Sequence, residues 1–414
     1  MTSNCSPSQV IFKPHNRQAN LNERRRLKMA RSAHAYMRGS TVKFYEWLES
    51  SRGKRVPQGP PIWICGDCHV GNLGPVANAS GRVALAIRDL DQTVIGNPAH
   101  DLIRLGLSLA TAIRSSDLPG VTTALVLEQM AEGYIEALGN GGQGRKPSST
   151  PPAAVRRILE RSLKRRWHHL AEERIEDVTP RIPFGKSFWP ISAAERTEIH
   201  EVFKTIEIRR LVTSLKGRDE EDRVEVLDAA YWVKGCSSLG RLRFSVLIGI
   251  GRKKERRENG FCLIDVKEAV PAVAPRSRTP KMPSDNAERV VQGARMLSPY
   301  LGERMLPWRF LNSTVVLREL LPQDLKLEMD QLTRDEAISA ARYLASVVGV
   351  AHGSQLDHKT RQEWQTVLSR NRSKTVDAPS WLWSSVVELV AHHESAYLEH
   401  CRSYALEVAL RKRS

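Results

Sequence analysis

Four polar residues near the N-terminal end of the chain have the types and spacing that metal-assisted transfer to a hydroxyl group requires. Residues 66–72 read GDCHVGN, so Asp67 and Asn72 lie five positions apart in a segment that also contains Gly66 and Gly71. Asp89 and Asp91 follow a short apolar run. A carboxylate can orient or deprotonate a hydroxyl, and carboxylate and amide oxygens bind Mg²⁺ on nucleotide phosphates. We therefore predict Asp67 as the catalytic residue and Asn72, Asp89 and Asp91 as metal ligands.

A glycine-rich segment much later in the chain is a candidate for holding phosphates. Residues 235–240 read GCSSLG and precede a strand-like pattern. Glycine lets backbone N–H groups approach a phosphate closely because no Cβ intervenes. The segment is neither a Walker A loop nor a Rossmann fingerprint, so an ordinary hairpin turn is the alternative. The residues that we predict to contact the nucleotide are Gly235, Ser237, Ser238 and Gly240.

Two charged residues after this segment could complete a nucleotide site. Lys267 follows the apolar run 261–266, and a lysine there would place a compact charge on the α- and β-phosphates. Glu288, in the helical pattern that follows, is the candidate ion-pair partner of Lys267. The alternatives are an exposed lysine at a strand end and an exposed glutamate on a helix.

Further polar groups lie around the 66–72 segment. Asp101 stands at the expected start of a helix, where a carboxylate caps N–H groups, and it could also brace this loop. Cys65 and Cys68 form a CxxC pair. We favour two reduced thiols over a redox pair, and half a zinc site would lack a second close cysteine pair.

The overall charge indicates an anionic partner. The 414 residues contain 63 Lys and Arg against 46 Asp and Glu, a formal net charge of +17. Nucleotide phosphates, a phosphorylated substrate or nucleic acid would suit this charge, although Arg on exposed helix faces would produce it as well. The first thirty residues are polar and basic, and no run of eighteen apolar residues occurs. We therefore expect a cytoplasmic protein without a membrane span.

Hydrophobic periodicity predicts a helix-rich α+β protein. Helices are expected over 22–52 with a break at Gly39, and over 98–113, 122–138, 153–175, 284–297, 335–355 and 381–411. Strands are expected over 62–65, 83–87, 241–248, 261–266 and 314–320.

These elements suggest five regions. The first is an N-terminal arm, 1–20, and the second, 21–140, carries the predicted catalytic and metal-binding loops. A linker and helical segment, 141–225, precedes a sheet region, 226–330, with the glycine-rich segment and Lys267. The last region, 331–414, contains helices expected to pack on the second.

At this point the motifs resemble a family. The 66–72 segment resembles the GDxHxGN loop of aminoglycoside phosphotransferase-like kinases, and residues 89–102 resemble their DFD…GxPxxDLA metal-binding segment, with Arg88 as a departure. Over residues 20–405 the chain is similar to the bacterial domain-of-unknown-function family 2252, which is grouped with protein-kinase-like folds. The resemblance implies a bilobal fold with Asp67 catalytic, Asn72 and Asp89 on Mg²⁺, Asp91 accessory, Gly235 and Gly240 at the phosphates and Lys267 on the nucleotide.

The order of these parts differs from that in kinases. Kinases place the glycine-rich loop and lysine before the catalytic and metal-binding loops, whereas here they come after. We therefore expect a circularly permuted kinase-like fold. The helix at 340–355 resembles the one that leads into a kinase catalytic loop, and it should dock beside 62–65 from the far end of the chain.

The expected function is transfer of a phosphoryl group from ATP, with Mg²⁺, to a hydroxyl of a small molecule. The alternatives are nucleotidyl transfer at the same site, a nucleotide-binding pseudokinase, a nucleic-acid-associated regulator and a metal-dependent hydrolase. Neither the acceptor nor the oligomeric state can be derived from the motifs.

Overall fold

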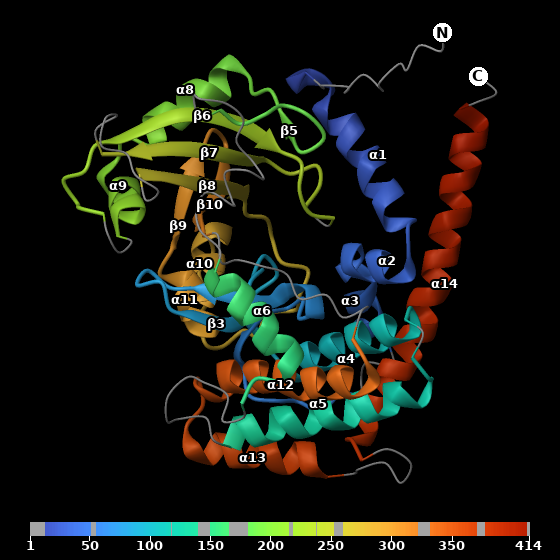
Figure 1. Cartoon of the computed structure of the whole chain (residues 1–414). Coiled ribbons are helices and arrows are strands. Elements are labelled where there is room, and N and C mark those ends of the chain that lie inside the picture. Colours follow the sequence, from blue (N-terminus) through green and yellow to red (C-terminus); the bar gives the residue numbers. More distant parts are fainter. Residues whose placement is uncertain are drawn as a thin grey trace.

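A six-stranded antiparallel sheet lies at one end of the molecule and a group of long helices at the other (Figure 1). The chain is therefore a mixed α and β protein, as its hydrophobic patterns predict. The computed structural model describes residues 13–50, 55–116, 118–139, 150–164, 181–214, 218–236, 238–251, 260–321, 332–370 and 377–411. The predicted N-terminal arm up to residue 12, most of the predicted linker, the predicted helix beyond Lys164 and Ser237 lie outside these residues.

The sheet has the strand order β5-β6-β7-β8-β10-β9, with every neighbouring pair antiparallel. Side chains alternate between its two faces because a strand has a period of two. Ile264 and Val266 belong to the apolar core on one face, whereas Asp265 and Lys267 line a cleft on the other. Its strands are β5 (Phe188–Trp189), β6 (Val224–Trp232), β7 (Arg243–Ile250), β8 (Phe261–Glu268), β9 (Met305–Phe310) and β10 (Ser313–Leu320).

Two helices, α8 (Ala193–Val202) and α9 (Ile206–Thr213), pack against the apolar face of this sheet. α8 begins with a capping box between Ser192 and Glu195, and α9 follows it. Both contribute apolar side chains to the core that contains Ile264. α10 (Asn286–Leu297) and the short α11 (Pro299–Gly302) connect β8 to β9.

The helical part of the molecule is built around α4 (Pro98–Arg114). Asn97 caps its start and Pro98 occupies the first turn, which explains why the helix begins there. All of its residues from Pro98 to Ile113 are buried. The surrounding helices are α5 (Val121–Gly139), α6 (Ala153–Lys164), α12 (Arg334–Gly353), α13 (His358–Ser369) and α14 (Ser380–Arg411).

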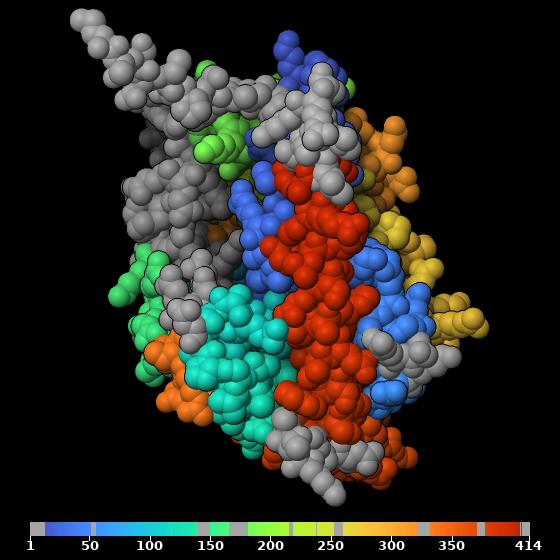
Figure 2. Space-filling view, turned by 90° about the vertical axis from the view of Figure 1, so that its right-hand side faces the viewer, coloured from blue at the N-terminus to red at the C-terminus, as the bar shows by residue number. Residues whose placement is uncertain are grey.

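The N-terminal helices connect the two parts. The sequence predicted a single break, at Gly39, but two breaks separate α1 (Arg17–Met29), α2 (Ala33–Gly39) and α3 (Thr41–Glu49), which follow the short η1 (Pro14–Asn16). The additional break arises because Ser32 is extended and caps α2 through its hydroxyl. α1 lies beside the end of α14, where Arg26 pairs with Glu407, and Figure 2 shows α14 in red along this face.

Two small two-stranded sheets hold the predicted catalytic segment between the large sheet and the helices, and only the second of them is a hairpin. β1 (Ile62–Ile64) pairs with β4 (Val94–Gly96), and β2 (Leu73–Ala77) pairs with β3 (Val83–Ile87). The turn η3 (Val70–Asn72) precedes β2. Among the described residues, no helix is long and apolar enough to cross a membrane.

Candidate active site

The loop at residues 66–72 leaves β1 through a backbone conformation that requires glycine. Gly66 has a φ of +73°, and a Cβ on it would lie 2.1 Å from the carbonyl oxygen of Gln92. Tyr45 donates its hydroxyl to the Gly66 carbonyl at 2.5 Å. Gly66 therefore fixes the direction in which Asp67 enters the site.

A buried network braces the same loop from the helical side. Asp101, on the first turn of α4, accepts hydrogen bonds from the backbone N–H groups of Cys65 at 2.7 Å and Gly66 at 2.9 Å. His352 of α12 places Nε2 3.2 Å from Oδ2 of Asp101, the oxygen that also accepts from Cys65, and its Nδ1 lies 2.9 Å from the Tyr134 hydroxyl. Asp101 and His352 are fully buried. Asp101 thus braces the loop, one of the two roles predicted for it.

Asp67 is held in one orientation by side chains from α3 and α4. Its Oδ1 accepts from Nε of Arg104 at 2.8 Å, and its Oδ2 accepts from the Thr41 hydroxyl at 3.0 Å. Nε2 of His69 lies 3.9 Å from Oδ2. Arg104 is fully buried and also donates to the Met37 carbonyl at 2.7 Å. Asp67 is only 7% exposed, and it faces the cleft from a rigid setting.

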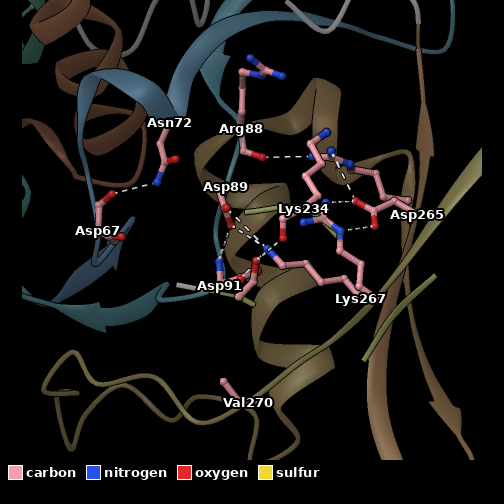
Figure 3. Close-up of polar contacts among 12 residues, drawn as sticks. Asp67, Asn72, Arg88, Asp89, Asp91, Lys234, Asp265, Lys267 and Val270 are labelled. Carbon is pink, nitrogen blue, oxygen red and sulfur yellow. Dashed lines mark hydrogen bonds and ion pairs between the residues drawn. The ribbon is translucent and has the colours of Figure 1, made fainter. Parts of the chain in front are cut away.

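Asn72 and Asp89 line the same cleft as Asp67. Asn72 donates through Nδ2 to the backbone carbonyl of Asp67 at 3.0 Å, which leaves its amide oxygen for another contact (Figure 3). The N–H of Arg88 donates to the Asn72 carbonyl at 2.7 Å and so ties the end of β3 to the loop. The Asp89 side chain is 45% exposed in the cleft.

Lys267 joins this cluster from the sheet. Its Nζ lies 2.5 Å from Oδ2 of Asp91 and 3.4 Å from Oδ1 of Asp89, and Figure 3 shows its side chain reaching between the two. Lys267 and Asp89 are 178 residues apart along the chain. The structure therefore brings together the predicted lysine and the predicted metal-binding carboxylates.

The two carboxylates beside Lys267 have opposite pKa shifts. Burial alone would raise the pKa of Asp89, but the positive charges of Lys267 and Arg243 outweigh it and lower that pKa. Burial and the neighbouring Asp89 raise the pKa of Asp91, against the opposing effect of Lys267. Asp89 thus remains the stronger candidate for holding a cation.

The glycine-rich segment forms the connection between β6 and β7. Gly235 and Ser238 line the cleft, and Gly235 has a φ of +96°. Gly240 points elsewhere, since a Cβ on it would lie 2.9 Å from Nε2 of Gln18 on α1. The structure thus brings Gly235 and Ser238, but not Gly240, to the other candidate residues.

The structure does not pair Glu288 with Lys267. Glu288 is exposed on the first turn of α10, where its N–H bonds to the capping Asp285 at 3.0 Å. The next residue, Arg289, is buried and donates to the backbone carbonyls of Asp91 and Val270 at 3.1 and 2.9 Å. The predicted partnership was wrong because the helix turns Arg289, rather than Glu288, toward the acidic segment.

A second ion-pair cluster beside Lys267 had no motif in the sequence. Arg243 donates to both oxygens of Asp265, at 2.8 and 2.6 Å, and Arg318 lies 3.8 Å from that carboxylate. Burial alone would raise the pKa of Asp265, but Arg243 lowers it to about 2. Strand register places Arg243 opposite Lys267 and Arg318 opposite Asp265. The two-residue period of a strand could have predicted that Asp265 and Lys267 share one face of the sheet. Placing Arg243 and Arg318 beside them requires the strand register, which the sequence does not give.

These groups surround a cleft of about 370 Å³ between the sheet, the N-terminal helices and the 66–72 loop. Of the residues that the structure describes, seven Lys or Arg and four Asp line it. Its volume lies in the range of small-molecule sites. The cleft thus combines the glycine-rich connection, Lys267 and the predicted catalytic loop in one positively charged space.

Comparison with known proteins identifies the family to which the chain belongs. A family model described as "Uncharacterized protein conserved in bacteria (DUF2252)" matches residues 17–403. The chain belongs to the DUF2252 family. No curated protein and no solved structure shows a significant match to it. The family assignment thus confirms the predicted resemblance to family 2252 and does not extend to kinases.

The cleft of this DUF2252 protein fits Mg²⁺ better than a transition metal. Within the described residues, no group of three or more His, Cys, Asp or Glu side chains could hold a metal by itself. Mg²⁺ is ordinarily held by one or two carboxylates together with water and substrate phosphates. The partly exposed carboxylate of Asp89 and the amide oxygen of Asn72, which has no hydrogen bond within the described residues, match that requirement.

The CxxC pair of the DUF2252 chain brackets Asp67, with Cys65 just before the 66–72 loop and Cys68 within it. Cys65 and Cys68 are buried and have free thiols. The hydrogen bond with Cys68, together with burial, raises the pKa of the Cys65 thiol well above its ordinary value. A thiol of this kind is a poor nucleophile, which favours packing over redox chemistry.

Proposed function

We propose that this DUF2252 protein is an ATP- and Mg²⁺-dependent phosphotransferase that acts on a hydroxyl group of a small molecule. One observation carries the proposal: the ammonium group of Lys267 lies 3.4 Å from Asp89 although the two are 178 residues apart in the chain. Their separate motifs, a lysine on a strand and an acid after a hairpin, converge in one cleft with Asp67. Phosphoryl transfer requires this convergence because it depends on positioning and on neutralising phosphate charge.

We also propose that the fold is kinase-like and circularly permuted. In support, the glycine-rich segment joins β6 to β7, Lys267 lies on the next strand, β8, and α10 follows. This is the succession of glycine-rich loop, lysine strand and helix found in kinases. In addition, Gln355, just after α12, bonds to both the N–H and the carbonyl of Trp63 in β1, at 2.8 and 3.0 Å. This contact between the end of α12 and β1 supports the permuted order.

The proposed reaction assigns a role to each residue. The acceptor hydroxyl oxygen forms a bond to the γ-phosphorus of ATP while the bond to the β,γ-bridging oxygen breaks, and ADP leaves with that electron pair. Asp67 orients the hydroxyl and takes its proton, which then passes to water. Mg²⁺ held by Asp89 and Asn72 would neutralise charge on the phosphates. Lys267 would exchange its contact with Asp89 for the α- and β-phosphates, and Gly235 would offer its N–H to them.

The size of the cleft favours a nucleotide over nucleic acid. A net charge of +17 suits either partner. The cationic side chains that face Asp67 and Asp89, however, line a space of about 370 Å³, which cannot admit a duplex. A nucleotide-binding protein without turnover is the second candidate, because Arg104 and Thr41 engage both oxygens of Asp67.

The test is incubation of the protein with Mg²⁺, a metabolite extract and ATP labelled at the α or γ position. Label transferred from the γ position alone indicates phosphoryl transfer, and label from the α position indicates nucleotidyl transfer. Asp67→Asn, Asp89→Asn and Lys267→Met should each lower transfer at least about 100-fold, since each removes charge at the reacting phosphates or the hydroxyl.

Lys281→Met is the matched control because Lys281 is an exposed lysine outside the cleft. It should transfer label as the wild type does. Binding of Mg–ATP without transfer in any extract would replace the enzyme by the non-catalytic alternative. Absence of Mg–ATP binding to the wild type would contradict both.

A further inference from the structure

The end of the cleft nearest the N-terminal helices carries positive charge that nothing in the proposed reaction uses. Lys28 of α1 and Arg38 of α2, here called the α1–α2 cations, line the cleft together with His69 and Gly71 of the active-site loop. A Cβ on Gly71 would lie 2.8 Å from Cζ of Arg38, so the guanidinium rests directly on the loop backbone. The α1–α2 cations are therefore neighbours of the residue proposed to hold the acceptor hydroxyl.

The carboxylates of the cleft all have other cationic partners. Asp67 pairs with Arg104, and Asp265 pairs with Arg243. Asp89 and Asp91 both pair with Lys267. The acidic groups that line the cleft are thus already engaged and do not neutralise the α1–α2 cations.

Arg38 itself has no hydrogen bond or ion pair within the described part of the chain. The groups that its charge acts on are Lys28, His69 and Cys236, of which the first repels it. Lys28 donates to the Gly235 carbonyl at 2.7 Å and has no carboxylate partner among the described residues either. Two neighbouring cations without a counter-ion are a recognition site for an oxyanion, and a guanidinium can bind one through two parallel hydrogen bonds.

His69 is a second group in this region, and one of its two ring nitrogens is unsatisfied. It is 4% exposed and lines the cleft, and its buried Nδ1 has no hydrogen-bond partner among the described residues. Burial, followed by the charges of Arg38 and Arg104, lowers its pKa well below the ordinary value. A neutral imidazole can donate or accept one further hydrogen bond, and a buried polar atom without a partner is costly unless a ligand satisfies it.

We propose that the acceptor carries an oxyanion, either a phosphate or a carboxylate, which Arg38 and Lys28 bind while His69 bonds to the polar part of the same molecule. The inference rests on the proposed function, because it names the class of that reaction's acceptor. It separates this chain from the aminoglycoside kinases that its loop resembles, since a polycationic acceptor would be repelled by the α1–α2 cations.

The experiment measures anion binding with the nucleotide site filled. The wild type is saturated with Mg²⁺ and the β,γ-imido analogue of ATP, which occupies the γ-phosphate position. It is then titrated calorimetrically with glycerol 2-phosphate, glycerate and glycerol. The two anions should bind and glycerol should not, and the tighter of the two identifies the phosphate or the carboxylate as the preferred group.

Variants assign the binding to the α1–α2 cations. Arg38→Gln should weaken binding of the tighter anion at least about tenfold, because a charge-assisted hydrogen bond is lost. Arg31→Gln is the matched control, since Arg31 is an exposed arginine in the connection between α1 and α2 and does not line the cleft. It should bind the anion within about twofold of the wild type. Circular dichroism spectra that match the wild type show that the variants fold.

Three outcomes would overturn the inference. These are equal binding of glycerol and the anions, unchanged anion binding by Arg38→Gln, and weaker binding of the ATP analogue rather than of the anion in that variant. The last would assign Arg38 to the γ-phosphate. If the wild type fails to bind the analogue, the proposed function fails instead, and the same anion titration without nucleotide still decides the role of Arg38.

Discussion

Asp67 owes its setting to Arg104, a residue that belongs to no recognised motif. Arg104 lies fully buried in the middle of α4, and the carboxylate that it contacts within the described structure is that of Asp67, at 2.8 Å. Burying a guanidinium is costly unless it is paired and hydrogen-bonded. The pair therefore couples the position of the proposed catalytic group to the stability of the helical core.

Arg104→Gln should lower the free energy of unfolding by about 3 kcal/mol, because it leaves the Asp67 carboxylate without its charged partner. The double variant Arg104→Gln/Asp67→Asn should recover part of this loss, since neither buried charge remains. Urea denaturation measures both. Arg114 lies on the same helix as Arg104 and forms an exposed ion pair with Glu394 of α14. Arg114→Gln should therefore cost less than about 1 kcal/mol. Strictly additive effects of the two buried substitutions would contradict the coupling.

His100, on the first turn of α4, allows a test of how the stability of the protein depends on pH. It is 8% exposed, and burial lowers its pKa to about 4 despite the neighbouring Asp101. The unfolded chain binds a proton near pH 6.5, so the stability contributed by the neutral imidazole is complete above that pH and is lost as pH falls toward 4. Between pH 7.5 and pH 5 the wild type should lose about 2 kcal/mol more than His100→Gln in urea denaturation. Parallel pH dependences would show that His100 does not remain neutral in the folded protein.

At the scale of elements, the β1–β4 pair and the β2–β3 hairpin place the residues of the 66–72 loop. Gly66 and Gly81 both have positive φ, of +73° and +79°. A Cβ on Gly66 would lie 2.1 Å from the Gln92 carbonyl oxygen, whereas a Cβ on Gly81, in the β2–β3 turn, would meet no atom within 4 Å. Substitution of Gly81 therefore measures backbone strain alone, whereas substitution of Gly66 measures that strain together with a steric overlap.

Gly81→Ala should cost about 1 kcal/mol, the strain of a left-handed alanine. Gly66→Ala should cost at least about 3 kcal/mol, because the same strain is joined by an overlap with backbone that cannot move aside. Thermal or urea unfolding of the pair measures the difference. Equal losses would mean that the loop shifts to accommodate a side chain and that its position is not fixed by Gly66.

The sequence was most informative where a local pattern determines the element. Strands β1, β3, β7, β8 and β10 and helices α4, α5, α10, α12 and α14 follow from apolar periodicity, and the spacing of Asp67, Asn72 and Asp89 identified one side of the cleft. The strands β2, β4, β5, β6 and β9 were missed because they are short, interrupted by polar residues, or stabilised by their partners. Arg104, Arg243 and Arg38 were missed for a related reason, since only tertiary contacts distinguish them from the many other arginines.

At the scale of the whole molecule, the C-terminal helices complete a core that begins near the N-terminus. In α12, Ala340, Leu344 and Val348 are fully buried in the core that also contains α4 and α5. Gly133 of α5 permits a close approach, since a Cβ there would lie 2.2 Å from the Arg342 carbonyl oxygen of α12. His352 carries this packing to the active-site loop through Asp101. The proposed catalytic half of the cleft is thus assembled from both ends of the chain.

Removing these helices should therefore prevent folding of the part that holds Asp67. A chain ending at residue 331 loses α12 to α14 and exposes the buried faces of α4 and α5, each large apolar side chain costing roughly 1.5–3 kcal/mol. We expect it to aggregate or to lack a cooperative urea transition. A chain ending at residue 396 keeps the buried Leu382, Val386 and Leu389 of α14 and loses the contacts with α1, so it should unfold cooperatively at a modestly lower urea concentration. A cooperative transition of wild-type stability in the shorter chain would show that residues 13–321 fold alone and that α12 does not complete the core.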